Sequence, residues 1–187
     1  MHHSLKVYTR FQQSFLKMYI FLGSWTRIPL IGRLVRLVAN SYGSKVSGGF
    51  LLTAEEAEQI VDRAGGLALG PCACRKAFHN CDGPAQAEIM IGIGRNIFMD
   101  AHPGEFEEIT TQEAKDILKE SHQKGLIHTI VKCGRDFYAI CNCCSCCCVP
   151  LRLNKRYGIG NALLRREDIV AQVTGGQPLQ PAGVSQG

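Results

Sequence analysis

The strongest constraint in this sequence is a run of six cysteines within eight residues, at 141–148. Neighbouring cysteine side chains point apart, so disulfides here would need a separate partner for each thiol. The apolar stretch near the N-terminus is followed by no small-residue cleavage site, so nothing indicates export to an oxidising compartment. We therefore expect these thiols to ligate metal. Six are too many for one four-coordinate centre.

A second group of cysteines precedes this run and leaves only Cys133 alone between the two. A cubane iron–sulfur cluster normally takes four thiolates, and the nine grouped sulfurs are enough for two [4Fe-4S] clusters with one to spare. We favour two clusters, and one cluster with unused thiols stays open. Cys133 fits a small buried hydrophobic residue better than a tenth ligand. The predicted ligands are Cys72, Cys74, Cys81, Cys141, Cys143, Cys144, Cys146, Cys147 and Cys148.

The cysteine run also carries an expectation about how its ligands divide. If residues 141–148 are extended, alternate side chains face opposite ways. One side would then hold Cys141, Cys143 and Cys147, and the other Cys144, Cys146 and Cys148. The earlier cysteine group could complete either set.

Zinc is the principal rival metal. Structural zinc sites usually draw their ligands from two Cys-x₂₋₄-Cys pairs. Such pairs do not occur cleanly here, although Cys141, Cys144 and Cys147 follow one another at three-residue steps. Iron–sulfur ligation is therefore favoured.

Two other residues are candidates for contact with a cluster. Arg75 directly follows Cys74 and could offset the negative charge of a thiolate-bound cluster. His128 could ligate iron or donate to a cluster sulfur, although a strand histidine bonded to a carbonyl is the more common case. The chain has no Ser/His/Asp grouping and no complete glycine-rich nucleotide motif, so we predict no catalytic residue.

The N-terminal segment has an unusual charge distribution, with seven Lys or Arg residues and no acidic residue before Glu55. Apolar residues recur at helical spacing over residues 4–25, and again from Ile28 to Val38. Neither stretch supplies the roughly 20 apolar residues of a membrane-spanning helix. We expect two amphipathic helices in which residues 4–40 contact a membrane surface or a subunit of a membrane complex. This places the protein in the cytoplasm, at the inner face of the membrane. Because the positive charge belongs to one segment, nucleic acid is a poor candidate partner.

The remaining patterns predict an α+β fold. A Gly/Ser-rich linker is expected at 41–49, and capping boxes at Thr53/Glu56 and Thr110/Glu113 predict helices to about residues 64 and 124. Residues 67–72 read as extended, 88–94 as a strand or a short helix, 126–140 as a hairpin and 161–173 as a helix. We expect an anchor and linker over 1–50, a cluster-binding domain with a helix–hairpin unit over 51–174, and a disordered tail over 175–187.

These motifs together resemble a family of ferredoxin-like iron–sulfur proteins of anaerobic prokaryotes. The likeness covers about residues 52–155 and rests on PCACR, CDGP, ITTQEA, GLIH and ICNCCSCCC, of which only the last is highly specific. It implies cluster binding, often next to a conventional ferredoxin domain. Where the family has a further cysteine after CDGP, this chain has Ala85-Gln86-Ala87-Glu88.

The function predicted from the sequence is electron transfer with redox partner proteins. One alternative is a redox-sensing regulator, in which the helix at 111–124 and the following hairpin would form a winged helix. Another is an enzyme with an open iron on the side of Glu88. The missing thiolate could instead be replaced by a Glu88 oxygen or by a cysteine of the second motif, and we favour the cysteine.

Overall fold

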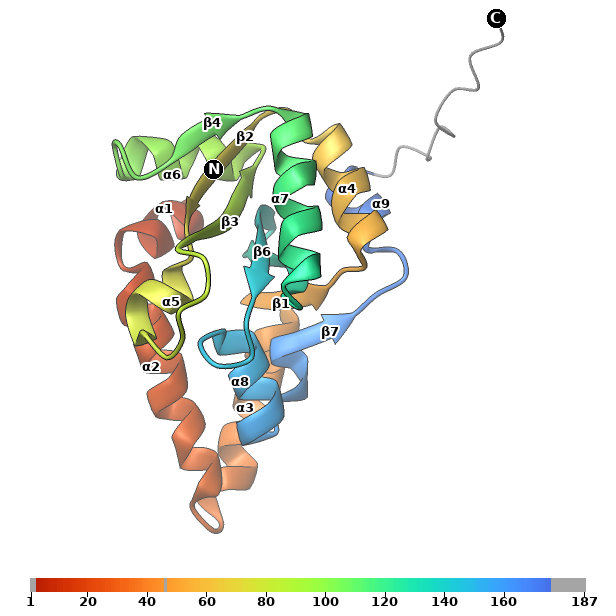
Figure 1. The fold of residues 1–187 in the computed structure, drawn as a ribbon. Coiled ribbons are helices and arrows are strands. Elements are labelled where there is room, and N and C mark those ends of the chain that lie inside the picture. The colour runs from red at the N-terminus through yellow and green to blue at the C-terminus, as the bar shows by residue number, and fades with distance from the viewer. Residues whose placement is uncertain (1–2, 46, 176–187) are drawn as a thin grey trace, which may run out of the picture.

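A single mixed sheet organises the part of the chain that the computed structural model describes, residues 3–45 and 47–175. Its strand order is β4-β2-β3-β6-β5-β1-β7, and all neighbours are antiparallel except β1 and β7 (Figure 1). The strands are β1 (Ser47–Leu51), β2 (Leu67–Pro71), β3 (Gln86–Ile91), β4 (Glu107–Ile109), β5 (Ile127–Cys133), β6 (Asp136–Cys143) and β7 (Leu163–Arg165).

Helices lie on both faces and at one end of this sheet (Figure 1). They are α1 (His3–Arg10), α2 (Gln12–Ser24), α3 (Ile31–Lys45), α4 (Ala54–Arg63), α5 (Ala73–Phe78), α6 (Ile93–Ala101), α7 (Thr111–Gln123), α8 (Val149–Tyr157) and α9 (Ile169–Val173). Short 3₁₀ turns, η1 (Trp25–Arg27) and η2 (Gly160–Ala162), follow α2 and precede β7. The predicted α+β class and the N-terminal helices are confirmed.

Strand register decides which side chains reach each face, because directly opposed residues in antiparallel strands point the same way. Ile89, Ile140 and Ile130 are aligned across β3, β6 and β5 and are fully buried. They belong to the core that α4, α7 and α9 cover, together with Ile60 and Leu118. This is the larger hydrophobic core of the described chain.

The opposite face carries the neighbouring row of side chains. Met90 and Ala139 are opposed there and pack with Phe98 of α6 and Leu5 of α1. Gly94 permits this packing, because a Cβ atom at that position would lie 2.2 Å from the carbonyl oxygen of Tyr138. Two residues further along the same face lie Glu88 and Cys141, so this is the face from which the cysteines project.

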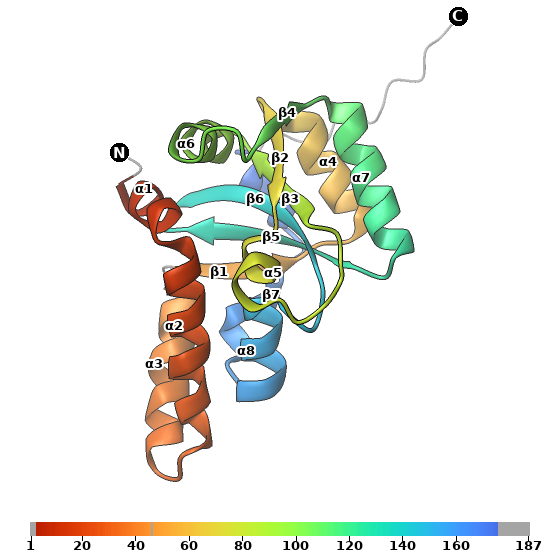
Figure 2. The same cartoon turned by 60° about the vertical axis from the view of Figure 1, so that its left-hand side comes forward.

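The helices α2 and α3 form a hairpin that extends beyond the sheet alongside α8 (Figure 2). Its base is fixed to the domain, since Asn40 accepts a hydrogen bond from the Asn161 backbone N–H at 2.8 Å and Arg36 donates to the Tyr157 carbonyl of α8 at 3.4 Å. None of the helices in the described residues is long and apolar enough to cross a bilayer.

The apolar face of this N-terminal region is only partly covered by the rest of the protein. Among the described residues, every large hydrophobic side chain that is exposed lies between Val7 and Tyr42. Leu30, at the tip of the α2–α3 hairpin, is 93% exposed, and Leu37 is 69% exposed. Packing within the chain therefore accounts for one part of the predicted amphipathic pattern and leaves another part without an internal partner.

Several predicted elements need correction. The single helix expected over 4–25 is divided at Phe11 into α1 and α2. The linker expected at 41–49 is instead the end of α3 and the start of β1, whose residues hydrogen-bond to β5. The segment 88–94 is strand β3 followed by the unforeseen helix α6, and 161–173 contains β7 before α9. The expected tail from residue 175 lies almost wholly outside the described residues.

The winged-helix reading is not supported by the topology. Strands β5 and β6 form the expected hairpin, but they lie in the interior of the sheet between β3 and β1. The helix α7 packs against α4 and the sheet rather than on a second helix of a helix-turn-helix.

Both predicted capping boxes are present, and the one at α7 gives a stability test. The Thr110 hydroxyl accepts from the Glu113 N–H at 3.2 Å, and the Glu113 carboxylate accepts from the Thr110 N–H at 2.7 Å. We expect Thr110→Ala to lower the free energy of unfolding by about 1 kcal/mol in urea titrations. The neighbouring exposed Thr111→Ala, which leaves the box intact, serves as control; equal losses in both would contradict the capping role.

Candidate metal centre

Nine cysteines converge at the end of the sheet where β6 stops. The strand ends at Cys143, the chain turns through residues 144–147, and α8 begins after Cys148. The segment from β2 through α5 brings the earlier cysteines to the same place, because α5 and α8 both pack against α2. The cysteines divide into two adjacent groups there.

The first group contains four cysteines, and we call it the four-cysteine group: Cys81, Cys144, Cys146 and Cys147. Their sulfur atoms all lie within 4.8 Å of one another. The Cys81 Sγ lies 3.5 Å from that of Cys144 and 3.6 Å from that of Cys147. Four converging thiols of this kind can bind a metal ion or a metal–sulfur cluster.

The second group lies deeper, on the sheet face, and we call it the five-cysteine group: Cys72, Cys74, Cys141, Cys143 and Cys148. The Cys148 thiol contacts those of Cys143 and Cys74, and Cys143 also contacts Cys141. The Thr129 hydroxyl lies 3.3 Å from the Cys143 sulfur. Soft thiols in a buried setting again suit a metal–sulfur centre. The group has one thiol more than the four that a cubane cluster takes.

The expected alternation along the cysteine run is therefore correct as far as Cys146 and wrong at Cys147 and Cys148. It holds for Cys141 and Cys143, which share a face because they are two apart in β6. It fails for Cys147 and Cys148, which exchange groups, since residues 144–147 form a turn rather than an extended strand. The earlier cysteines complete both groups, Cys81 the first and the Cys72/Cys74 pair the second.

Cys133, the tenth cysteine, belongs to neither group. It lies at the far end of β5, is 9% exposed, and packs in the core with Leu5 and Met90. This agrees with the prediction of a small buried hydrophobic residue. All ten cysteines are free thiols in the structure.

Arg75 lies between the two cysteine groups, as its predicted role in balancing their charge requires. It is 5% exposed and donates to the carbonyl oxygens of Pro84 at 2.9 Å and Asn142 at 3.0 Å. Burial opposes its charge, but the nearby thiols of Cys72 and Cys144, one from each group, outweigh this and raise the pKa of the guanidinium. A fixed cation at this point favours the thiolate form that binds metal.

His128 is not brought into either cysteine group. It lies on β5 opposite Asn142, and both side chains project to the face of the sheet that does not carry the cysteines. Its Nδ1 lies 2.8 Å from the Asn142 Oδ1, and burial lowers the pKa of the imidazole. Because an amide oxygen only accepts, Nδ1 carries the proton of this bond. A direct role of His128 at a cofactor stays a prediction.

Asn142 was missed by the sequence reasoning, although it separates two of the ligands. It is fully buried, and its backbone oxygen accepts from Arg75 while its amide donates to the Ala87 carbonyl at 3.3 Å. With the His128 bond, three contacts fix the end of β6 from both sides. The sequence feature that indicates its role is a polar residue within an otherwise apolar strand. A buried polar side chain of this kind requires hydrogen-bond partners.

Glu88 joins the five-cysteine group. It is 4% exposed and opposes Cys141 across the strands β3 and β6. One carboxyl oxygen lies 3.6 Å from the Cys141 sulfur, and the other accepts from the Ala73 N–H at 3.4 Å. Burial raises the pKa of this carboxyl to about 7. The position is therefore close enough to the thiols for an oxygen ligand, as the sequence had suggested.

The thiols of the four-cysteine group have unequal acidities. Hydrogen bonds from the Cys146 thiol and the Gly83 N–H lower the pKa of Cys81 to about 6. The same contact with Cys81 raises the pKa of Cys146 to about 12, because Cys146 acts as the donor. The Cys81 thiolate is thus available near neutral pH, and a bound cation would be needed to release the proton of Cys146.

Comparison of the chain with protein-family models, with curated proteins and with solved structures finds no match.

The raised pKa of Glu88 predicts how the stability of the metal-free protein depends on pH. The folded protein keeps this proton up to about pH 7, whereas the unfolded chain loses it near 4.5, so unfolding releases a proton between these values. We expect the free energy of unfolding to fall by about 3 kcal/mol from this group as the pH rises through that window.

The measurement is urea denaturation of the reduced, metal-free protein at several pH values. Glu88→Gln should remove this part of the pH dependence, and the exposed Glu107→Gln should keep it. A Glu88→Gln variant with the same pH profile as the unmodified protein would show that Glu88 titrates normally.

Proposed function

We propose that this chain is an iron–sulfur electron-transfer protein that holds two [4Fe-4S] clusters and works at the surface of a membrane. The observation that carries the proposal is the convergence of nine of the ten cysteines on two adjacent groups with a buried arginine between them. Each group has at least the four thiols that a cubane takes. The motif resemblance to ferredoxin-like proteins points the same way.

Electron relay is favoured because the two groups are joined through the chain itself. Cys143 and Cys144 are consecutive residues and belong to different groups. In the four-cysteine group all residues but Cys147 are partly exposed, whereas Cys72, Cys143 and Cys148 of the other group are buried. A redox partner protein would exchange electrons at the exposed group, and the buried group would carry them inward.

Zinc remains a second candidate for the four-cysteine group because of its distances. Four thiolates held tetrahedrally at about 2.3 Å from one ion lie about 3.8 Å apart. The separations of Cys81 from Cys144 and Cys147, 3.5 and 3.6 Å, are close to that value. A closed zinc site would have a structural role and would leave redox chemistry to the five-cysteine group alone.

The membrane surface is the partner that best fits the N-terminal helices. Their uncovered side chains are apolar, and the only charged residues before Glu55 are Lys and Arg. Anionic lipid headgroups attract such cations while the apolar side chains enter the interface. Because the cytoplasmic leaflet of a cell membrane is the anionic one, we propose that the protein binds at the inner face.

Metal analysis of single-cysteine variants tests the two-cluster proposal. Anaerobically purified protein should contain about eight irons and eight acid-labile sulfides for two cubanes. Cys81→Ser and Cys143→Ser should each lose up to half of the iron, from different groups, and should change the EPR spectrum of the reduced protein differently. Cys133→Ser is the matched control and should keep the full content.

Two results would contradict this assignment. Zinc without sulfide would replace the electron-transfer proposal by a structural metal module. A content of about four irons would indicate a single cluster. The variant that loses all of this iron, Cys81→Ser or Cys143→Ser, would then identify the cysteine group that holds the cluster.

The hairpin tip offers a sharp test of membrane binding. Leu30 has a φ of 69°, a conformation that favours glycine, yet its side chain is 93% exposed and gains almost nothing from packing. We expect the folded Leu30→Gly variant to be at least as stable as the unmodified protein. Its binding to anionic vesicles should be about tenfold weaker or more, since a leucine buried in lipid contributes about 2 kcal/mol.

Vesicle sedimentation measures the binding, and thermal unfolding measures the stability. Vesicles of neutral lipid and buffers of high salt should also reduce binding, because they remove or screen the attraction of the basic residues. If Leu30→Gly and the unmodified protein sediment with the vesicles to the same extent, the membrane proposal is contradicted.

A further inference from the structure

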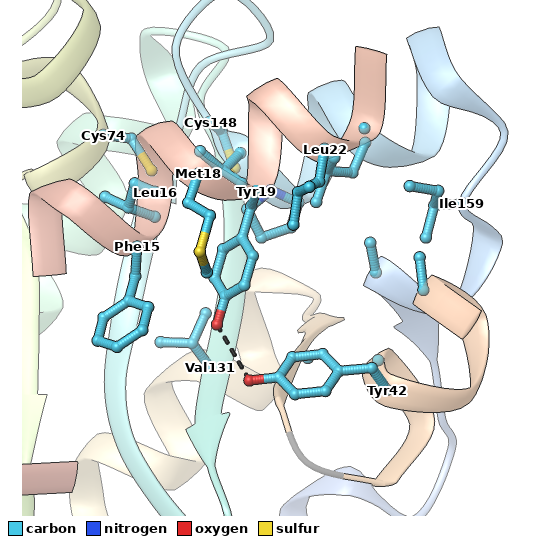
Figure 3. Close-up of a pocket in the computed structure, with 18 of the residues that line it drawn as sticks. Phe15, Leu16, Met18, Tyr19, Leu22, Tyr42, Cys74, Val131, Cys148 and Ile159 are labelled. Atoms are coloured by element: carbon cyan, nitrogen blue, oxygen red, sulfur yellow. Dashed lines mark hydrogen bonds between the residues drawn. The ribbon is translucent and has the colours of Figure 1, made fainter. Parts of the chain in front are cut away.

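A large cavity lies between the α2–α3 hairpin and the sheet, and the proposed electron transfer does not account for it. Its volume is about 660 Å³, within the range of about 300–1,000 Å³ that is usual for small-molecule sites. Figure 3 shows side chains of both hairpin helices facing across it. The five-cysteine group and Glu88 line only one end, so a cluster bound there would leave the apolar remainder.

The other end of the cavity opens among the exposed apolar residues of the hairpin. Leu22, Trp25 and Leu34 line the cavity and are also 42%, 41% and 61% exposed. The proposed membrane-facing surface is thus continuous with the cavity. A ligand from the lipid phase could enter without crossing water, and an alkyl tail could extend back toward the lipid.

Tyrosine hydroxyls are the most numerous oxygen-bearing side-chain groups that line the cavity. Four of the five tyrosines of the chain line this cavity: Tyr8, Tyr19, Tyr42 and Tyr138. The hydroxyls of Tyr19 and Tyr42 meet at 3.1 Å across the two helices (Figure 3), and those of Tyr8 and Tyr138 are hydrogen-bonded to each other. Neutral phenols can donate to carbonyl oxygens, and their rings, with that of Phe15, present flat apolar surfaces.

The charges around the cavity disfavour an anionic ligand. Its inner end holds the five thiols and the Glu88 carboxyl, none of which can supply a positive charge to an anion. Lys132 is the only Lys or Arg side chain among the described residues that line it, and its ammonium lies over the Phe50 ring at 5.8 Å. A fatty acid or a phospholipid phosphate would therefore find acidic groups where it needs cations.

We propose that this cavity binds a lipid-soluble quinone, with its ring among the tyrosines and its tail toward the hairpin surface. A quinone is neutral and planar, carries two carbonyl acceptors for phenol donors, and reaches the site from the bilayer. The inference rests on the proposed function for the membrane-facing mouth and the neighbouring redox centre. The binding itself does not require a loaded cluster.

Trp25 provides a direct readout, because it is the only tryptophan of the chain and lines the cavity. Titration of the full-length, metal-loaded protein with decylubiquinone should quench its fluorescence saturably. Undecanoic acid, which has a tail of the same ten carbons and an anionic head, should neither quench nor compete. Linear quenching like that of free tryptophan, or equal competition by the fatty acid, would overturn the proposal.

Two leucines on α3 give a matched pair of variants. Leu34 lines the cavity and Leu37 does not, although they are 61% and 69% exposed. We expect Leu34→Glu to weaken quinone binding about tenfold or more, because it places a carboxylate at the mouth, and Leu37→Glu to change it less than about twofold. Equal effects of the two variants would contradict a site in this cavity.

The same samples separate this inference from the proposed function. Iron content and vesicle binding without saturable quenching would refute the quinone site and leave the electron-transfer proposal standing. Saturable quenching that responds to Leu34→Glu in protein without iron–sulfur clusters would support the quinone site and refute the cluster assignment.

Discussion

The point at which β6 ends governs the arrangement of the whole site. Cys141 and Cys143 are held on one face of the sheet by pairing with β3 and β5, and the following residues leave the sheet in a turn. The buried Asn142 fixes this point, since it bonds to Arg75 through its backbone and to His128 and Ala87 through its side chain. If β6 were one residue longer, the Cys144 side chain would point to the opposite face of the sheet, and the cysteines would no longer divide into these two groups.

Arg75 makes the two groups electrostatically dependent on each other. Its guanidinium is close to thiols of both groups, and two backbone carbonyls hold it in place. If both groups held clusters, reduction of one would add negative charge, and the shared cation would stabilise this charge less well once the second cluster was also reduced. Under the proposed function, the potentials of the two centres would therefore be coupled, as close charges in a buried setting are.

The sequence predicted well those features that depend on local chemistry. The capping boxes at Thr53 and Thr110 formed because their side chains and backbone are three residues apart. The burial of Cys133 and the position of Arg75 also followed from local pattern. The division of the cysteine run did not, because it depends on where the pairing of β6 with β5 ends, and the hydrophobic periodicity of the sequence does not contain this contact. The helix α6 and the edge strand β4 were missed for a similar reason, since their apolar stripes are short and packing determines them.

The hairpin of α2 and α3 shows how one apolar pattern can serve two purposes. Part of its stripe is buried against the domain, where Gly23 allows close contact with Leu153 and Tyr157 of α8. The rest remains uncovered, and a sequence pattern alone does not separate these parts because both have helical spacing. A leucine at the tip in a backbone conformation suited to glycine adds an independent argument, because its conformational cost is not offset within the chain. Under the proposed function, an external apolar phase would provide that offset, and the hairpin would be both the anchor of the protein and one wall of its cavity.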